Sequence, residues 1–241
     1  MEDQIILIDK PANISSFGVV AKVRGYLKAQ FGHKIKVGHT GTLDPFATGL
    51  LILLTGKNTK KSSDFLKLDK VYEATLKLGF VSSTGDPEGE IQQYPSKNLR
   101  AQLGSQEATE PRKDGRERAC LKRDTVESVL QEFIGKIEQR PPKFSAIKIG
   151  GQRAYKLARK GQDFEIPTRE VEIYSLEILD YNYPELTIRC HVSSGTYIRT
   201  LAEDIGKALG TGAYLTALRR TQIANYSVAD ATPLSVFSSK D

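Results

Sequence analysis

Apolar positions along the chain recur at two spacings, and segments of the two kinds are interleaved. Apolar and polar residues alternate over residues 72–80 and 186–192, which is typical of strands with one buried face. Short and almost continuous apolar runs over residues 5–8 and 50–54 predict strands that are buried on both faces. The chain therefore supplies strands of both kinds to one predicted core.

A spacing of three to four residues predicts the first helices. One begins at Ser15 or Ser16, either of which can serve as an N-cap, and another begins near Asp124, where Glu127 completes a capping-box pattern. The expected buried stripe of the first helix is Phe17, Val20, Val23 and Leu27. That of the second is Val126, Val129, Leu130, Phe133, Ile134 and Ile137.

Two more helices are predicted over residues 198–209 and 213–220. In the first of these, Arg199 lies off the apolar stripe and in the first turn, where the helix dipole disfavours a cation unless a carboxylate is near. Strands and helices alternate irregularly, and several strand pairs have the spacing of hairpins. We therefore expect an α+β fold in which helices pack against a mixed, largely antiparallel sheet.

Composition narrows the classes of protein without selecting one. The 241 residues are enough for one large domain or two small ones, and a net charge of +6 with 39% hydrophobic residues suits a globular protein with a core and an anionic partner. Eight Lys or Arg and four Asp or Glu fall within residues 97–123, so we expect a mobile basic insertion there. No apolar run is long enough for a bilayer and the N-terminus is no signal peptide, which favours the cytoplasm.

Cysteine and histidine spacing predicts no metal site. Cys120 and Cys190 form no CxxC motif, and the three histidines have no ligand spacing. We therefore expect no structural zinc and no disulfide framework.

Residues 37–51, with the sequence VGHTGTLDPFATGLL, combine candidate chemistry with a restrained backbone. Asp44 is the only carboxylate in this stretch, and Pro45 biases it towards an extended conformation. An isolated Asp-Pro usually marks a simple turn. Here His39, Thr40 and Thr42 add polar groups, and an apolar strand follows directly, so we expect a functional loop that is anchored in the fold.

The stretch from Gly38 to Gly49 closely resembles the GHTG-x-LDP-x-ATG motif of the TruB family of tRNA pseudouridine synthases. Other segments resemble that family in its own order: LIDKP (7–11), LDKVYEA (68–74), GDPEG (85–89), PPKFSAIKIGGQRAY (141–155), GTYIRTL (195–201) and YLTALRRT (214–221). The resemblance covers nearly the whole chain outside residues 97–123. It implies the pseudouridine synthase fold, a mixed central sheet flanked by helices with an RNA-binding cleft.

The resemblance also implies a reaction. Uridine 55 in the T arm of tRNA is flipped out, detached from its sugar, rotated and rejoined through carbon 5. Asp44 is then the catalytic aspartate, Arg199 its partner, and Tyr72 the ring against the target base. Asp44 could attack the base or the sugar, or act as a base, and the sequence leaves these alternatives open. Neither a metal nor a cofactor is implied.

Several residues are expected to hold the RNA. The resemblance implies that His39 holds the opened loop, that Tyr197 supports the site and that Leu218 lines the pocket. Expected phosphate contacts are Lys10, Lys60, Arg153, Lys156, Arg219 and Arg220. From the residues alone, Lys10 fits a turn lysine equally well, the helix near Arg153 fits a solvated face, and Tyr72 fits a core position.

The resemblance has one departure, and two alternatives stay open. Bacterial members commonly carry a C-terminal PUA domain, and we expect no complete one here. One alternative is a tRNA-folding chaperone without catalysis, against which the set Asp44, Tyr72 and Arg199 argues. The other is a guide-dependent synthase similar to the box H/ACA subunit, which the short chain disfavours. We expect a monomer that binds the T arm of tRNA, without a membrane or an obligate protein partner.

Overall fold

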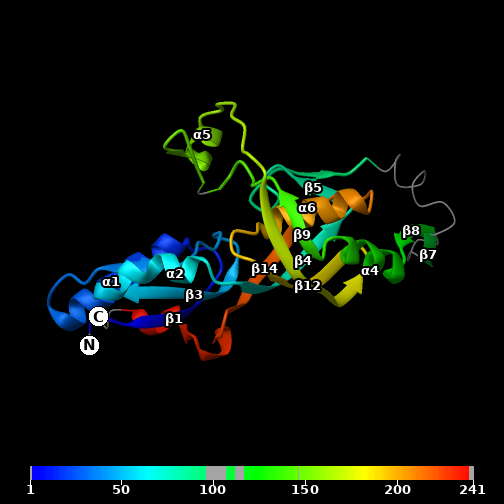
Figure 1. Cartoon of the computed structure of the whole chain (residues 1–241). Coiled ribbons are helices and arrows are strands. Elements are labelled where there is room, and N and C mark those ends of the chain that lie inside the picture. The colour runs from blue at the N-terminus through cyan, green and yellow to red at the C-terminus, as the bar shows by residue number, and fades with distance from the viewer. Residues whose placement is uncertain (1, 96–106, 112–116, 146, 239–241) are drawn as a thin grey trace. The chain divides into compact units, whose positions relative to one another are not determined.

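The computed structural model describes the chain as two compact units (Figure 1). Unit 1 comprises Met1–Glu73, His191–Ser194 and Ala217–Asp241, and unit 2 comprises Ala74–Cys190 and Gly195–Thr216. The described residues are 2–95, 107–111, 117–145 and 147–238. Within them, no helix is long and apolar enough to cross a membrane.

Ten of the described strands form one sheet, in the order β16-β1-β3-β14-β4-β13-β12-β9, with β2 beside β3 and β15 beside β14. Pairing is antiparallel for β1 with β3, β2 with β3, β12 with β9 and β14 with β15. It is parallel for β1 with β16 and for β3 with β14. The expectation of a mixed, largely antiparallel sheet with helices is therefore confirmed. The bounds are β1 Ile5–Lys10, β2 Val37–His39, β3 Thr48–Thr55, β4 Lys70–Leu78, β9 Gly135–Gln139, β12 Arg169–Asn182, β13 Glu185–Val192, β14 Ala213–Ile223, β15 Tyr226–Ser227 and β16 Thr232–Pro233.

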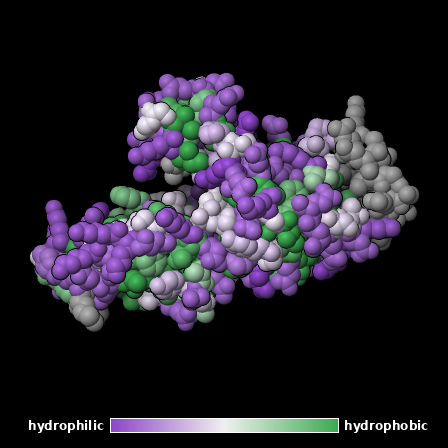
Figure 2. All heavy atoms as spheres, in the orientation of Figure 1, coloured by the Kyte–Doolittle hydropathy of each residue, from purple (hydrophilic) through white to green (hydrophobic). Residues whose placement is uncertain are grey.

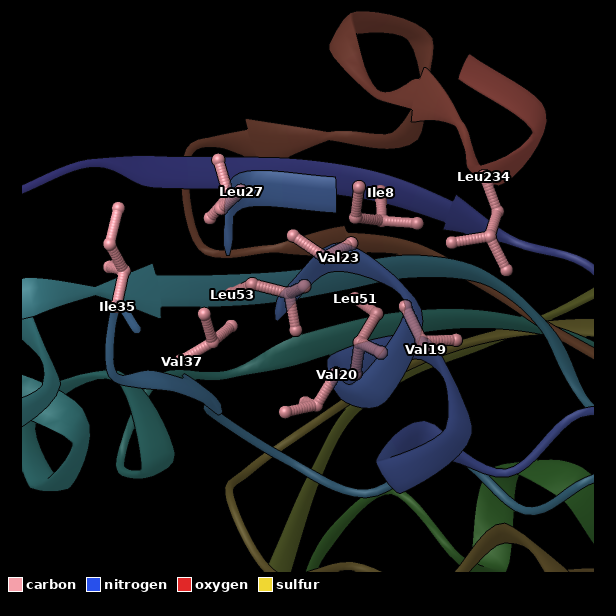
Figure 3. Packing of buried hydrophobic residues seen from close by; sticks show 10 residues of the cluster. All are labelled: Ile8, Val19, Val20, Val23, Leu27, Ile35, Val37, Leu51, Leu53 and Leu234. Carbon is pink, nitrogen blue, oxygen red and sulfur yellow. The ribbon is translucent and has the colours of Figure 1, made fainter. Parts of the chain in front are cut away.

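In unit 1, helix α1 (Ser16–Phe31) packs on β1 and β3 (Figure 3). Ser15 caps it, as expected, by accepting the Gly18 amide at 3.0 Å. The cluster in this core is Ile8, Val19, Val20, Val23, Leu27, Ile35, Val37, Leu51, Leu53 and Leu234. The predicted stripe is wrong at Phe17, which is 66% exposed, because Val19 occupies the inner face instead. After β3 follow η1 (Gly56–Lys61) and α2 (Ser62–Leu66), and η3 (Val228–Asp230) and η4 (Leu234–Phe237) lie near the C-terminus.

In unit 2, the predicted second helix is shorter than its stripe. Helix α4 (Arg123–Glu132) is followed by β9, which contains Ile137, and Ile134 is 39% exposed. The positive φ of Gly135, 105°, fits the change from helix to strand. The capping-box prediction is wrong as well, because Glu127 pairs with Arg123 at 2.8 Å and the N-cap Lys122 makes no side-chain cap. The other helices are α5 (Ala154–Arg159) and α6 (Ile198–Ala208).

The remaining strands of unit 2 form three hairpins. These are β5 (Phe80–Ser82) with β6 (Ile91–Gln93), β10 (Lys148–Ile149) with β11 (Gln152–Arg153), and β7 (Glu107–Pro111) with β8 (Glu117–Leu121). The third hairpin lies inside the segment that the sequence analysis expects to be a mobile insertion without regular structure. Residues 97–106 and 112–116 of that segment lie outside the described residues.

The predicted helix over residues 213–220 is wrong, because this segment belongs to β14. Its Ala, Leu and Arg residues have good helix propensity. The strand nevertheless lies between β3 and β4 in the sheet, where pairing on both edges overrides local preference. In β14, Leu218 and Arg220 are buried while Arg219 between them is half-buried.

Candidate active site

Asp44 lies in the loop between β2 and β3, and its neighbour Leu43 is held from one side by Ser16. The Ser16 hydroxyl donates to the Leu43 carbonyl at 2.9 Å and accepts the Leu43 amide at 2.8 Å. Ser16 is 1% exposed and is the first residue of α1, so the helix start fixes this backbone. Sequence reasoning considered Ser16 only as a cap and missed this role.

The other side of Asp44 is held by Lys10, which is 0% exposed. Its ammonium donates to the carbonyls of Pro11, Ile14 and Pro45 at 2.9, 2.8 and 3.1 Å. The Asn13 amide donates to the same Pro45 carbonyl at 2.8 Å. Because this ammonium faces backbone carbonyls inside the protein, Lys10 is a weaker candidate for a phosphate contact than an exposed lysine, and the predicted contact stays a prediction. Asp44 itself is half-buried between the two restraints.

Arg220, on β14, is a second buried cation that bonds backbone carbonyls on either side of Asp44 along the chain. Its side chain is 1% exposed, and it donates to the Leu50 carbonyl at 2.8 Å and to the Gly41 carbonyl at 3.1 Å. A Cβ at Gly49 would lie 2.3 Å from the Arg220 carbonyl oxygen, so only glycine allows this approach of β3 to β14. For the same reason, Arg220 is a weaker candidate for a phosphate contact than an exposed arginine, and that predicted contact also stays a prediction.

The ring of Tyr72, on β4, faces the guanidinium of Arg220, whose central carbon lies 6.0 Å from the ring centroid. Tyr72 is 8% exposed and Leu218 is 7% exposed, so both are nearly buried in unit 1. His39 ends β2 and is half-buried, and its Nδ1 accepts the Gly41 amide at 3.4 Å. Their contacts with a target base or an RNA loop stay predictions.

Arg199, in unit 2, is a buried cation with several partners. It is 5% exposed and lies 3.3 Å from a carboxylate oxygen of Asp86. It also donates to the Thr84 carbonyl at 3.1 Å and to the Phe144 carbonyl at 2.9 Å. Sequence reasoning expected a carboxylate near this helix start but named Asp44 and missed Asp86, although Asp86 lies inside the family-like GDPEG segment. The proposed pairing with Asp44 stays a prediction.

Tyr197, also in unit 2, is fixed before α6 begins. The Gln139 side chain accepts its amide at 2.8 Å and donates to its carbonyl at 3.1 Å, and Gln139 is 0% exposed. The guanidinium carbon of Arg169 lies 4.7 Å from the Tyr197 ring centroid. These contacts orient the ring but do not test its predicted role.

The other expected phosphate contacts lie at the surface. Lys60, Arg153 and Lys156 are exposed, as a phosphate contact requires. Arg219 is half-buried and donates to both carboxylate oxygens of Asp9, at 3.0 and 2.8 Å. The Asp9 carboxylate raises the pKa of Arg219 above its usual value. Because Arg219 already has an anionic partner, it is a weaker candidate than the three exposed cations.

Two titratable groups near these residues, the buried Lys70 and the half-buried Glu203, have shifted pKa values. Burial, with Arg220 close by, lowers the pKa of Lys70 to about 8 in unit 1. Burial raises the pKa of Glu203, which faces Arg199 and Asp86 in unit 2. In the described part of the chain, no group of three or more His, Cys, Asp or Glu could hold a metal ion.

Comparison with known proteins gives family matches over most of the chain. The profile of the "TruB family pseudouridylate synthase (N terminal domain)" matches residues 27–110 and 97–198, and that of the "tRNA pseudouridylate synthase B C-terminal domain" matches residues 199–239. The proteins named tRNA pseudouridine synthase B from Phocaeicola vulgatus and Aquifex aeolicus are 44% and 42% identical to this chain. The alignments cover 98% and 99% of this chain, and 92% and 75% of those proteins.

A solved structure, titled "Crystal Structure of a Cbf5-Nop10-Gar1 Complex", contains a chain of similar fold. The TM-score is 0.67 at 27% identity, over 97% of this chain and 53% of that chain, so this chain spans about half of its length. The fold, the motif around Asp44 and the two profile matches lead to one conclusion. The chain belongs to the TruB family of pseudouridylate synthases.

Proposed function

We propose that this protein converts uridine 55 in the T arm of tRNA to pseudouridine, with Asp44 as the catalytic carboxylate. The observation that carries the proposal is the loop itself. Asp44 lies between Leu43, bonded twice to Ser16, and Pro45, bonded to Lys10 and to the Asn13 amide. Family membership and the name of the relatives, tRNA pseudouridine synthase B, support the substrate and the reaction.

The proposed reaction requires a carboxylate with little freedom beside an unstacked base. Flipping the nucleotide exposes its glycosidic bond, and a carboxylate that is already held in place loses little further freedom when it reacts. Asp44 attacks the base or the sugar, or removes a proton to start elimination. The base is then turned and joined to the sugar through carbon 5. Tyr72 contacts the base, and His39, Tyr197 and Leu218 complete the substrate site.

Tritium release from 5-tritiated uridine in a T-arm hairpin tests the proposal, because the new bond at carbon 5 displaces that hydrogen. Asp44→Asn keeps the shape of the side chain and removes its charge, so it abolishes release while RNA still binds. Asp64→Asn makes the same change at an exposed position of α2 and serves as the matched control. Release by Asp44→Asn at the rate of the control contradicts the catalytic role.

We further propose that Asp44 and Arg199 depend on each other in the reaction, as a functionally coupled pair. Arg199→Lys keeps a charge but loses the planar geometry of the guanidinium, so it slows turnover. A double variant with Asp44→Asn is no slower than Asp44→Asn alone, because residues that act as a unit are strongly non-additive. Full activity of Arg199→Lys in single-turnover release overturns the coupling but leaves the role of Asp44 intact.

The same proposal includes a cytoplasmic monomer that works without guide RNA, protein partner or cofactor. Because a guide-dependent enzyme is inactive on its own, the purified chain and a T-arm hairpin suffice for the test. Release only after a guide RNA and partner proteins are added contradicts this part of the proposal. A chaperone without catalysis is distinguished by tRNA refolding without tritium release.

A further inference from the structure

The segment before Asp44 is unusually one-sided in charge. Residues 10–43 contain six Lys or Arg, namely Lys10, Lys22, Arg24, Lys28, Lys34 and Lys36, and no Asp or Glu. Lys10 is buried under the Asp44 loop, whereas the other five side chains are exposed. In Figure 2 the surface over α1 is largely hydrophilic. The local excess of cations therefore lies mainly at the surface of unit 1.

Three of these cations surround a hollow. Its lining residues are Ala21, Arg24, Gly25, Lys28 and Lys34, and its volume is about 460 Å³. Ala21, Arg24 and Lys28 follow the three- and four-residue spacing of one helix face, which is exposed and lies beside the buried stripe. The chain turns at Gly32, whose φ is 78°, and Lys34 comes back to the same hollow. Its floor is made of small residues.

Among the described residues, no carboxylate pairs with the cations at this hollow. In the described part of the chain, Arg24, Lys28 and Lys34 form no ion pair, and the nearest pair along the sequence joins His33 to Glu2 at 2.9 Å. A Cβ at Gly25 would meet no atom within 4 Å, so the hollow is open above the helix. Ordinary solvated helix faces mix both signs of charge, whereas this face offers one sign around an open space.

We propose that this hollow binds backbone phosphates of the tRNA substrate. The inference rests on the proposed function, which supplies an RNA, and adds a contact surface to it. Clustered cations without acidic partners bind a polyanion by releasing its counterions. Arg24 and Lys28 lie eight and twelve residues beyond Ser16, which is about 12 and 18 Å along the helix axis. Because Ser16 contacts Leu43 beside Asp44, the surface binds phosphates away from the flipped nucleotide and acts on affinity.

The test compares two triple variants. Arg24→Gln, Lys28→Gln and Lys34→Gln together remove the three charges and keep good helix formers. The control removes three exposed cations of unit 2 that each pair with a carboxylate: Lys136→Gln, Arg189→Gln and Lys207→Gln. The Kd for full-length unmodified tRNA is measured between about 50 and 200 mM salt. The hollow variant lowers the slope of log Kd against log salt by about 2 to 3.

A slope and a Kd equal to those of the control overturn the inference. A second pair of variants works without removing any native charge. Gly25→Glu places a carboxylate in the hollow and Gly25→Gln an isosteric neutral group, and both have room there. The Glu variant binds tRNA more weakly than the Gln variant by about tenfold, as expected for a charge that repels one phosphate. Equal affinity of the two variants also overturns the inference.

Tritium release separates this inference from the proposed function. At saturating enzyme, the hollow variant releases tritium at the wild-type rate because its effect is on binding. A wild-type chain that releases no tritium contradicts the proposed function. An active wild-type chain whose hollow variant binds tRNA like the control contradicts the hollow alone.

Discussion

Two groups of cations in unit 1 use the same side-chain chemistry in opposite ways. Lys10 and Arg220 lie inside the protein and donate to carbonyls of the segments around Asp44. Arg24, Lys28 and Lys34 surround an open hollow on α1 and have no ion pair within the described residues. Family-like segments contain the first group, which the sequence analysis assigned to RNA. We infer that burial, more than residue type, separates cations that hold the loop of Asp44 from cations that are available to an RNA.

The physical reason lies in what each ammonium or guanidinium contacts. A buried cation must replace water by other acceptors, and the three carbonyls around Lys10 do so. Two of those carbonyls, of Pro11 and Ile14, lie between β1 and α1, and the third, of Pro45, lies in the loop of Asp44 and also accepts the Asn13 amide. An exposed cation keeps its hydration and exchanges it for a phosphate at little cost. We therefore expect buried cations to set the geometry of Asp44 and exposed ones to set the affinity for RNA.

Adjacent arginines on β14 offer the strongest test of this comparison. Arg220→Met leaves the Leu50 and Gly41 carbonyls without their charged donor, and lowers the free energy of unfolding by about 3–5 kcal/mol. Arg219→Met removes a partly exposed pair with Asp9, which contributes about 1 kcal/mol or less. Urea denaturation of the two variants measures both values. Equal losses contradict the distinction between buried and exposed cations.

The burial of Lys70, a third buried cation of unit 1, can be tested through the pH dependence of stability. Its pKa in the folded chain, about 8, lies below the usual 10.5, so the unfolded chain binds more protons between these values and stability rises with pH. From pH 7 to pH 10 the wild type gains about 2–3 kcal/mol relative to Lys70→Met, which lacks this titration. Urea denaturation at the two pH values measures the gain. If the free energy of unfolding depends on pH in the same way for both proteins, the pKa of Lys70 is not lowered in the folded chain.

Two neighbouring serines separate helix stability from loop geometry. Ser16→Ala removes both bonds to Leu43, which lowers the free energy of unfolding by about 1–3 kcal/mol and slows tritium release at saturating enzyme. Ser15→Ala removes only the helix cap, lowers that free energy by about 1 kcal/mol and leaves the rate unchanged. Single-turnover rates and urea midpoints check both variants. A rate for Ser16→Ala equal to that for Ser15→Ala shows that the bonds to Leu43 do not position Asp44.

Local patterns predicted those parts of the fold that local forces decide. The alternation of β4 and the cap at Ser15 follow from side-chain periodicity and short-range bonds, and both are present in the structure. The helix expected over residues 213–220 failed because pairing with β3 and β4 turns that segment into the strand β14. Nothing in the local sequence shows that two strands will flank it.

Motif resemblance located the loop of Asp44 but not its supports. Lys10 lies thirty-five positions before Pro45 and Ser16 lies twenty-seven before Leu43, so only the fold brings them together. The local sequence Lys-Pro is the same whether the lysine is exposed to solvent or bonded to buried backbone carbonyls. Asp86 was missed for the same reason, because its contact with Arg199 joins the GDPEG segment to α6.

A matched pair of lysines distinguishes cations that hold the loop of Asp44 from cations that bind RNA. Lys10→Met and Lys60→Met make the same change at a buried and at an exposed position of unit 1. The measurement gives, for each variant, the single-turnover rate of tritium release at saturating enzyme and the Kd for a T-arm hairpin over a range of salt. We expect Lys10→Met to lower the rate at least tenfold with the salt slope unchanged. We expect Lys60→Met to keep the rate and to lower the salt slope by about 0.7–0.9. A wild-type rate and a reduced salt slope for Lys10→Met would contradict the account, because Lys10 would then bind RNA and would not hold the loop of Asp44.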